Sequence, residues 1–97
     1  LVDDICDTAG TLTNAASALK NEGAKSIYSY ITHGVLSKPA IERIESSRID
    51  KIIITDSILA TDDVKQSTKI EQLSIASLIG EAIGRITENK SVSSLFA

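Results

Sequence analysis

The stretch LVDDICDTAGTLTNAA, residues 1–16, decides the fold, because it leads from a β-strand through a short loop into a helix. The strand is indicated by Leu1, Val2 and Ile5, which are apolar and partly β-branched. The helix is indicated by an i, i+3, i+4, i+7 stripe, the spacing of one buried helix face: Leu12, Ala15, Ala16 and Leu19. Residues 21–23, Asn-Glu-Gly, are a stop signal for this helix. A strand followed directly by a helix is the first half of a βαβ unit.

The rest of the chain repeats the alternation. Short β-branched or aromatic segments predict strands at residues 26–31 and 51–55, and residues 69–74 are a further strand candidate. A second helix is expected from Ser37, a possible N-cap, with Pro39 in its first turn and an end near residues 48–50. A longer helix is predicted from apolar residues at 3.6-residue spacing: Ile75, Leu78, Ile79, Ala82, Ile83 and Ile86.

This order predicts an α/β fold with three layers, a mostly parallel sheet and helices on both faces. The polar residues 61–68 are expected to form a loop. With 97 residues, 42% of them apolar, the chain has room for one domain at most. It contains no methionine, and its first residue already lies in a predicted strand, so we expect a piece of a longer protein.

Charge and cysteine content exclude several classes of function. The net charge of -3 and the pI near 5.0 offer no basic face for nucleic acid or anionic lipid, so neither partner is expected. Cys6 is the only cysteine and no cysteine and histidine spacing fits zinc, which favours a reducing, cytoplasmic location. No apolar run approaches the roughly 20 residues of a membrane span, and no signal-peptide layout is present.

The loop after the first strand has the features of an anion site. It delivers the chain into a helix N-terminus, where free backbone N–H groups and the positive end of the helix dipole converge. Gly10 permits tight curvature there, and Thr8 and Thr11 add hydroxyl donors. The carboxyl end of a parallel strand is also where open α/β sheets bind their ligands. The loop therefore predicts a phosphate site that uses no lysine.

Asp3 and Asp4 need a different partner, because carboxylates repel phosphate. A divalent cation or a pair of sugar hydroxyls would suit them, and a phosphorylated sugar would satisfy both acids and loop. Neither the GxxxxGK[ST] nor the GxGxxG fingerprint is present. The alternative is that these acids are merely solvated beside the strand, with Thr8 or Thr11 as a plain helix cap.

The sequence resembles a known family at several places. VDDICDTAGT, residues 2–11, resembles the phosphoribosyl diphosphate loop of type I phosphoribosyltransferase folds. Three further segments resemble the ribose-phosphate pyrophosphokinases, also called phosphoribosyl diphosphate synthetases. They are GAKSIYSYITHGVLSKPAIERI at 23–44, IIITDSI at 52–58 and SVSSLF at 91–96. The likeness covers essentially the whole chain and corresponds to the carboxy-terminal third of that enzyme. It implies that residues 1–97 are part of a phosphoribosyltransferase-like domain.

The resemblance implies transfer of a diphosphoryl group from ATP to the 1-hydroxyl of ribose 5-phosphate, with Mg²⁺, giving phosphoribosyl diphosphate and AMP. Asp3 and Asp4 would hold the 2- and 3-hydroxyls of the ribose. The 5-phosphate would be wrapped by the loop residues Asp7, Thr8, Ala9, Gly10 and Thr11. The catalytic groups and the metal ligands of the family come from earlier parts of the chain. We therefore expect no catalytic and no metal-ligating residue here, and a segment that binds without turnover.

Two alternatives stay open: a nucleobase phosphoribosyltransferase, and a non-catalytic regulatory relative of the synthetase. The phosphate loop of that relative is degraded, so the intact DTAGT at residues 7–11 argues against it. The family also implies a homo-oligomer, commonly a hexamer. Leu59 and Ala60 stand where the family commonly has a proline. His33, just past the second predicted strand, is expected to be structural or ligand-adjacent, and Cys6 to pack as a small apolar residue whose pKa the neighbouring carboxylates raise.

Overall fold

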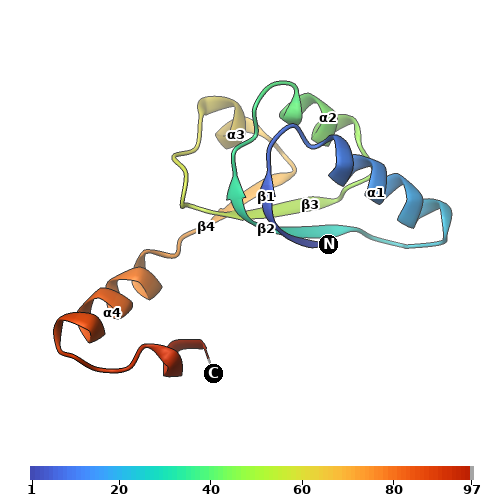
Figure 1. Cartoon of the computed structure of the whole chain (residues 1–97). Helices are drawn as coiled ribbons and strands as arrows, with labels where there is room; N and C mark the ends of the chain where they lie inside the picture. The colour runs from blue at the N-terminus through green and yellow to red at the C-terminus, as the bar shows by residue number, and fades with distance from the viewer. Residues whose placement is uncertain (97) are drawn as a thin grey trace.

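The computed structural model describes residues 1–96, in which strands and helices alternate (Figure 1). The elements in chain order are β1 (Val2–Cys6), α1 (Gly10–Asn21), β2 (Tyr28–Gly34), α2 (Ala40–Ser46), β3 (Lys51–Thr55), α3 (Asp62–Gln66), β4 (Ile70–Leu73), α4 (Ala76–Thr87) and the short 3-10 helix η1 (Ser93–Phe96). The predicted α/β class and the fourth strand are therefore confirmed.

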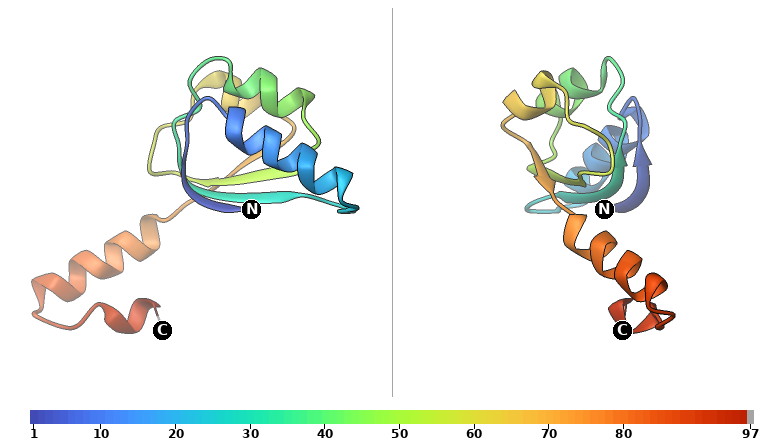
Figure 2. Two further views of the ribbon diagram at one scale, coloured as in Figure 1. Left: turned by 45° about the vertical axis from the view of Figure 1, so that its right-hand side comes forward. Right: turned by 90° about the vertical axis from the view of Figure 1, so that its left-hand side faces the viewer.

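The four strands form one parallel sheet in the order β1-β2-β3-β4. Asp3 lies opposite Ile31, and Ile31 lies opposite Ile54, so these residues share a row across three strands. Right-handed connections between consecutive parallel strands place their helices on one face. Accordingly, α1, α2 and α3 lie on the same side of the sheet in both figures (Figures 1 and 2).

The core lies between this face and the three helices. Its strand residues include Ile31, Ile52 and Ile54, each at most 3% exposed. The helices contribute Ala16 from α1, Ala40 and Ile44 from α2, and Val64 from α3. Ala16 on α1 and Ala40 on α2 are small and fully buried in this core.

The opposite face of the sheet and helix α4 are open to solvent. Tyr28, Tyr30 and Leu73 are all about half exposed or more. Helix α4 extends away from the sheet (Figure 1), and none of its residues is buried. The predicted helix is confirmed, but its apolar stripe has no covering partner within residues 1–96. No helix in the described part of the chain is both long and apolar enough to cross a membrane.

Three local expectations were wrong. Residues 61–68 contain α3, which begins after Thr61, whose hydroxyl accepts the Val64 N–H. Helix α2 begins at Ala40 rather than after Ser37; Ser37 contributes its carbonyl oxygen, not its side chain, to the helix start. Strand β2 is shifted toward the carboxyl end, so His33 lies within it rather than past it.

Candidate functional site

The loop between β1 and α1 consists of Asp7, Thr8 and Ala9, with Gly10 and Thr11 in the first turn of the helix. Ala9 occupies the N-cap position with φ at 65°, in the left-handed region, and is almost fully buried. No side chain caps α1, and its first turn holds no acidic residue. The alternative in which Thr8 or Thr11 is a plain helix cap is therefore wrong. The positive end of the helix dipole is left available to a ligand.

Three carbonyl groups in and beside this loop, those of Cys6, Thr8 and Ala9, accept hydrogen bonds from donors of the protein. The Cys6 carbonyl accepts the N–H groups of Val35 and Leu36 at 3.0 and 3.1 Å. The Ala9 carbonyl accepts the backbone N–H of Thr13 at 3.0 Å and its hydroxyl at 2.7 Å. Because C=O and N–H point in opposite directions across a trans peptide, fixing these oxygens also fixes the N–H groups that follow them.

Several N–H groups of the loop, among them those of Thr8, Gly10 and Thr11, have no hydrogen-bond partner within residues 1–96. Backbone donors without partners near the start of a helix are the elements of a phosphate site. The loop thus combines fixed carbonyls with available donors, which is the chemistry that the sequence predicts for it.

Asp3 and Asp4 lie on β1 just before the loop, and both side chains are exposed. The backbone N–H of Asp4 donates to Oδ1 of Asp3 at 2.8 Å. Hydrogen bonding with the Asp3 side chain, together with the N–H groups of Asp4 and Ile5 and the charge of His33, lowers the pKa of Asp4. Asp4 is therefore ionised at neutral pH and available as a hydrogen-bond acceptor.

His33 lies opposite Ile5 in the sheet, which explains its electrostatic interaction with the neighbouring Asp4. Its Nδ1 is 2.7 Å from the hydroxyl of Ser57, which follows β3. The Ser57 hydroxyl in turn donates to the Thr32 carbonyl at 3.3 Å. The sequence showed no partner for His33, because Ser57 is 24 residues away and only the sheet brings the two together.

Cys6 packs in the core, as expected, and is only 5% exposed. Burial is the largest cause that raises the pKa of its thiol, and the charges of Asp7 and Asp3 add to it. The expected carboxylate effect is present but secondary. The backbone N–H of Ala9 hydrogen-bonds the sulfur and partly offsets the rise in pKa.

Sequence reasoning missed Arg43, which reaches the loop from α2. Its Nη1 donates to the Thr8 carbonyl at 3.1 Å across 35 residues of sequence. A polar hollow of about 390 Å³ lies beside it between α1 and α2. The sequence pattern of α2 gave no signal for Arg43, because its partner is a backbone oxygen.

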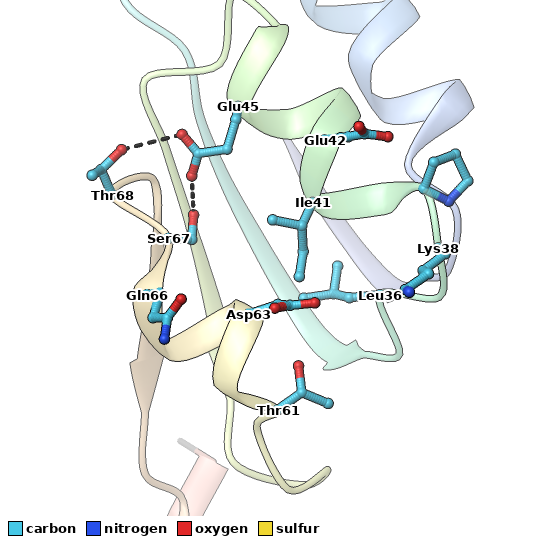
Figure 3. Close-up of a pocket in the computed structure, with 11 residues that line it drawn as sticks. Leu36, Lys38, Ile41, Glu42, Glu45, Thr61, Asp63, Gln66, Ser67 and Thr68 are labelled. Carbon is cyan, nitrogen blue, oxygen red and sulfur yellow. Dashed lines mark hydrogen bonds between the residues drawn. The ribbon is translucent and has the colours of Figure 1, made fainter.

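A larger cleft of about 670 Å³ lies between α2 and α3 (Figure 3). Its floor includes Leu36 and Ile41, and Glu45 at its side accepts hydrogen bonds from the hydroxyls of Ser67 and Thr68. None of its lining residues belongs to residues 2–11, so it is separate from the loop. Within residues 1–96, no three side chains of His, Cys, Asp or Glu gather as a metal site requires.

Comparisons of this chain with known proteins point to one family. The phosphoribosyl synthetase-associated domain matches residues 1–97. The ribose-phosphate pyrophosphokinase of Oceanobacillus iheyensis is 60% identical over 96 residues, which cover 99% of this chain and 30% of that protein. The enzyme of the same name from Bradyrhizobium diazoefficiens is 57% identical with the same coverage.

A solved structure supports the relation. The crystal structure of phosphoribosylpyrophosphate synthetase from Mycobacterium smegmatis superposes with a TM-score of 0.86 at 38% sequence identity, over 92% of this chain and 30% of that one. The chain thus spans about 30% of the length of the relatives it matches. It belongs to the phosphoribosyl synthetase-associated domain family and corresponds to the carboxy-terminal part of the ribose-phosphate pyrophosphokinases.

Proposed function

We propose that this chain supplies the ribose 5-phosphate pocket of a ribose-phosphate pyrophosphokinase. In the proposed reaction, the 1-hydroxyl oxygen of ribose 5-phosphate attacks the β-phosphorus of ATP. The bond from that phosphorus to the α-phosphate oxygen breaks, AMP leaves, and the hydroxyl proton is released. The observation that carries the proposal is the set of partnerless N–H groups of Thr8, Gly10 and Thr11, next to two exposed carboxylates, in a chain of this family.

The 5-phosphate is assigned to the loop of Asp7, Thr8, Ala9, Gly10 and Thr11. A phosphate dianion there would accept hydrogen bonds from the available backbone N–H groups and meet the positive end of α1. The hydroxyls of Thr8 and Thr11 add two further donors. Asp7 contributes through its backbone, because its carboxylate would repel the phosphate.

The ribose hydroxyls are assigned to Asp3 and Asp4. An ionised carboxylate accepts two hydrogen bonds at once, which suits the adjacent 2- and 3-hydroxyls of a ribose ring. The lowered pKa of Asp4 supports this role, because an ionised carboxylate only accepts hydrogen bonds, whereas a protonated acid carries an O–H donor. Together the acids and the loop would fix the ring at both ends and orient the 1-hydroxyl toward ATP.

The contribution of this chain to catalysis is positioning. Diphosphoryl transfer depends mainly on in-line orientation and on cations that stabilise the developing charge. The family resemblance implies Mg²⁺, but the described residues form no cluster that fits a metal ion. In the proposal, Mg²⁺ is therefore held by substrate phosphates and by groups outside this segment, as are the ATP contacts.

The proposal also includes a cytoplasmic homo-oligomer, with a hexamer as the expected form. The exposed apolar stripe of α4 supports an assembled protein, because contiguous apolar surface marks sites of protein contact. Analytical ultracentrifugation of the complete protein should give six times the mass of one chain. A monomer at micromolar concentration would contradict this part of the proposal.

The function is tested on the complete protein that carries this chain. With ATP, Mg²⁺ and ribose 5-phosphate, mass spectrometry should detect phosphoribosyl diphosphate and AMP in equal amounts. A nucleobase phosphoribosyltransferase would instead consume phosphoribosyl diphosphate and a base, and release pyrophosphate. A regulatory relative would bind ribose 5-phosphate, form no product alone, and change the rate of an active homologue. Either of these results would overturn the proposal.

The role of the acids is tested by substitution. Asp3→Asn and Asp4→Asn should each weaken ribose 5-phosphate binding by about tenfold or more in calorimetry, because a charged hydrogen-bond partner of the sugar is lost. Asp63→Asn is the matched control, since this residue lies on α3 and lines the separate cleft. Unchanged affinity in both β1 variants would refute the assignment of the ring hydroxyls.

A further inference from the structure

Resting on the proposed function, we propose that Arg43 is a positioning residue for the phosphate loop. From α2, its guanidinium donates to the Thr8 carbonyl, and it lies close to Gly10, two residues further along the chain. No ligand contact is assigned to it. Its effect on the sugar phosphate would be exerted through the backbone conformation of the loop and through its charge.

The first contact fixes the peptide plane between Thr8 and Ala9. Nη1 of Arg43 donates to the Thr8 carbonyl at 3.1 Å, and this oxygen accepts no other hydrogen bond within residues 1–96. Because the peptide is a rigid trans plane, it cannot rotate without losing the contact with Arg43. The N–H groups of the neighbouring planes are thereby kept in register.

This restraint is needed because the loop passes through Ala9 in the left-handed region, with φ at 65°. A residue with a Cβ atom is disfavoured there and remains only where its surroundings hold it. The Thr13 contacts hold the Ala9 carbonyl, on the helix side. Arg43 holds the preceding plane, so the strained residue is restrained from both directions.

The guanidinium of Arg43 also lies close to the backbone of Gly10. A Cβ atom on Gly10 would lie 3.3 Å from Nη1 and 4.0 Å from Cζ of Arg43. A side chain at position 10 would therefore require the guanidinium to shift by a few tenths of an ångström. A flat, delocalised cation fits against the backbone in this way, whereas the ammonium group of lysine is a compact point charge.

The charge of Arg43 is also available to the loop. Within residues 1–96 it forms no ion pair, although carboxylates elsewhere pair with Lys51, Arg85 and Lys90. The hollow beside it is lined by glycine, hydroxyl and amide side chains and by no carboxylate. Its positive field therefore adds to that of the α1 N-terminus, and both favour a dianion.

The test is steady-state kinetics of the complete protein with Arg43→Met, Arg43→Lys and the control Arg48→Met, an exposed arginine of the same region. Arg43→Met should raise KM for ribose 5-phosphate about tenfold, the factor expected when one hydrogen bond with a charged donor is lost. KM for ATP and kcat at saturating sugar should stay within about twofold, because the proposal assigns the ATP contacts to groups outside this segment and gives Arg43 no contact with the transferred group.

Arg43→Lys separates the two contributions of the residue and serves if Arg43→Met does not fold. It keeps the charge but not the planar contact, so KM for ribose 5-phosphate should rise about threefold. Arg48→Met should match the wild type. An unchanged KM in both Arg43 variants, with an active wild type, would overturn the role of Arg43 alone. A wild type that forms no phosphoribosyl diphosphate would overturn the proposed function instead.

Discussion

Gly34 is the last residue of β2 and lies against the side chain of the core residue Ile54. Its replacement by alanine measures how tightly the protein is packed there. A Cβ at this position would lie 2.9 Å from Cδ1 and 3.0 Å from Cγ2 of Ile54. Favourable carbon contacts are about 3.5 to 4.0 Å long, so the methyl group overlaps by roughly half an ångström or more. Ile54 is 2% exposed and cannot move into solvent.

Gly34→Ala should therefore lower the free energy of unfolding by about 1 to 3 kcal/mol, the usual cost of overpacking a core. Ile54→Val alone should cost about 0.5 to 1.5 kcal/mol, because it removes one buried methyl group. The removed group is Cδ1, the atom closest to the new methyl. The double variant should accordingly lose about 1 kcal/mol less unfolding free energy than the sum of the two single losses.

Urea unfolding of the complete protein, followed by circular dichroism, gives the four stabilities of this cycle. Gly84→Ala on α4 is the matched control, since nothing lies within 4 Å of its Cβ position and alanine is the better helix former by about 1 kcal/mol. Additive costs, within about 0.3 kcal/mol, would refute the claim that the two side chains compete for one space.

Three further predictions concern single side chains. The hydroxyl of Ser67 lowers the pKa of Glu45 below its ordinary 4.5, so the ionised Glu45 stabilises the fold fully above that pH and loses this effect as the pH falls through the lowered pKa. The difference in melting temperature between wild type and Glu45→Gln should therefore vanish at low pH, and a difference that persists at pH 2 would contradict this. Cys6 should react with iodoacetamide at pH 8 far more slowly in the native than in the urea-unfolded protein, because burial raises the pKa of its thiol; equal rates would contradict its place in the core. Ser29→Ala should leave the urea midpoint unchanged or raised, because the buried Oγ has no hydrogen-bond partner within residues 1–96; a loss above about 1 kcal/mol would show a missing partner.

The sequence was sufficient for the features that depend on local pattern. Isoleucines at positions 52–54 indicated a buried parallel strand, and the stripe from Leu12 to Leu19 indicated α1. Helix α3 was missed because Val64 is its only buried residue, which leaves no periodicity to detect. Its N-cap threonine followed by two aspartates was the available signal.

Features that depend on distant partners were beyond sequence reasoning. The contact of Arg43 with Thr8 and that of Ser57 with His33 join segments separated by 35 and 24 residues, so no local spacing encodes them. Likewise, the spacing on α4 correctly indicated a helix with an apolar stripe, but it carried no information about what covers that stripe. The left-handed Ala9 was also unexpected, since glycine is the residue that usually adopts this conformation.

The most direct test of the central claim is a crystal structure of the complete protein with ribose 5-phosphate. The account predicts phosphate oxygens about 3 Å from the backbone nitrogens of Thr8, Gly10 and Thr11, and the ring hydroxyls at the carboxylates of Asp3 and Asp4. A sugar phosphate bound elsewhere, with these N–H groups directed away from it, would contradict the account.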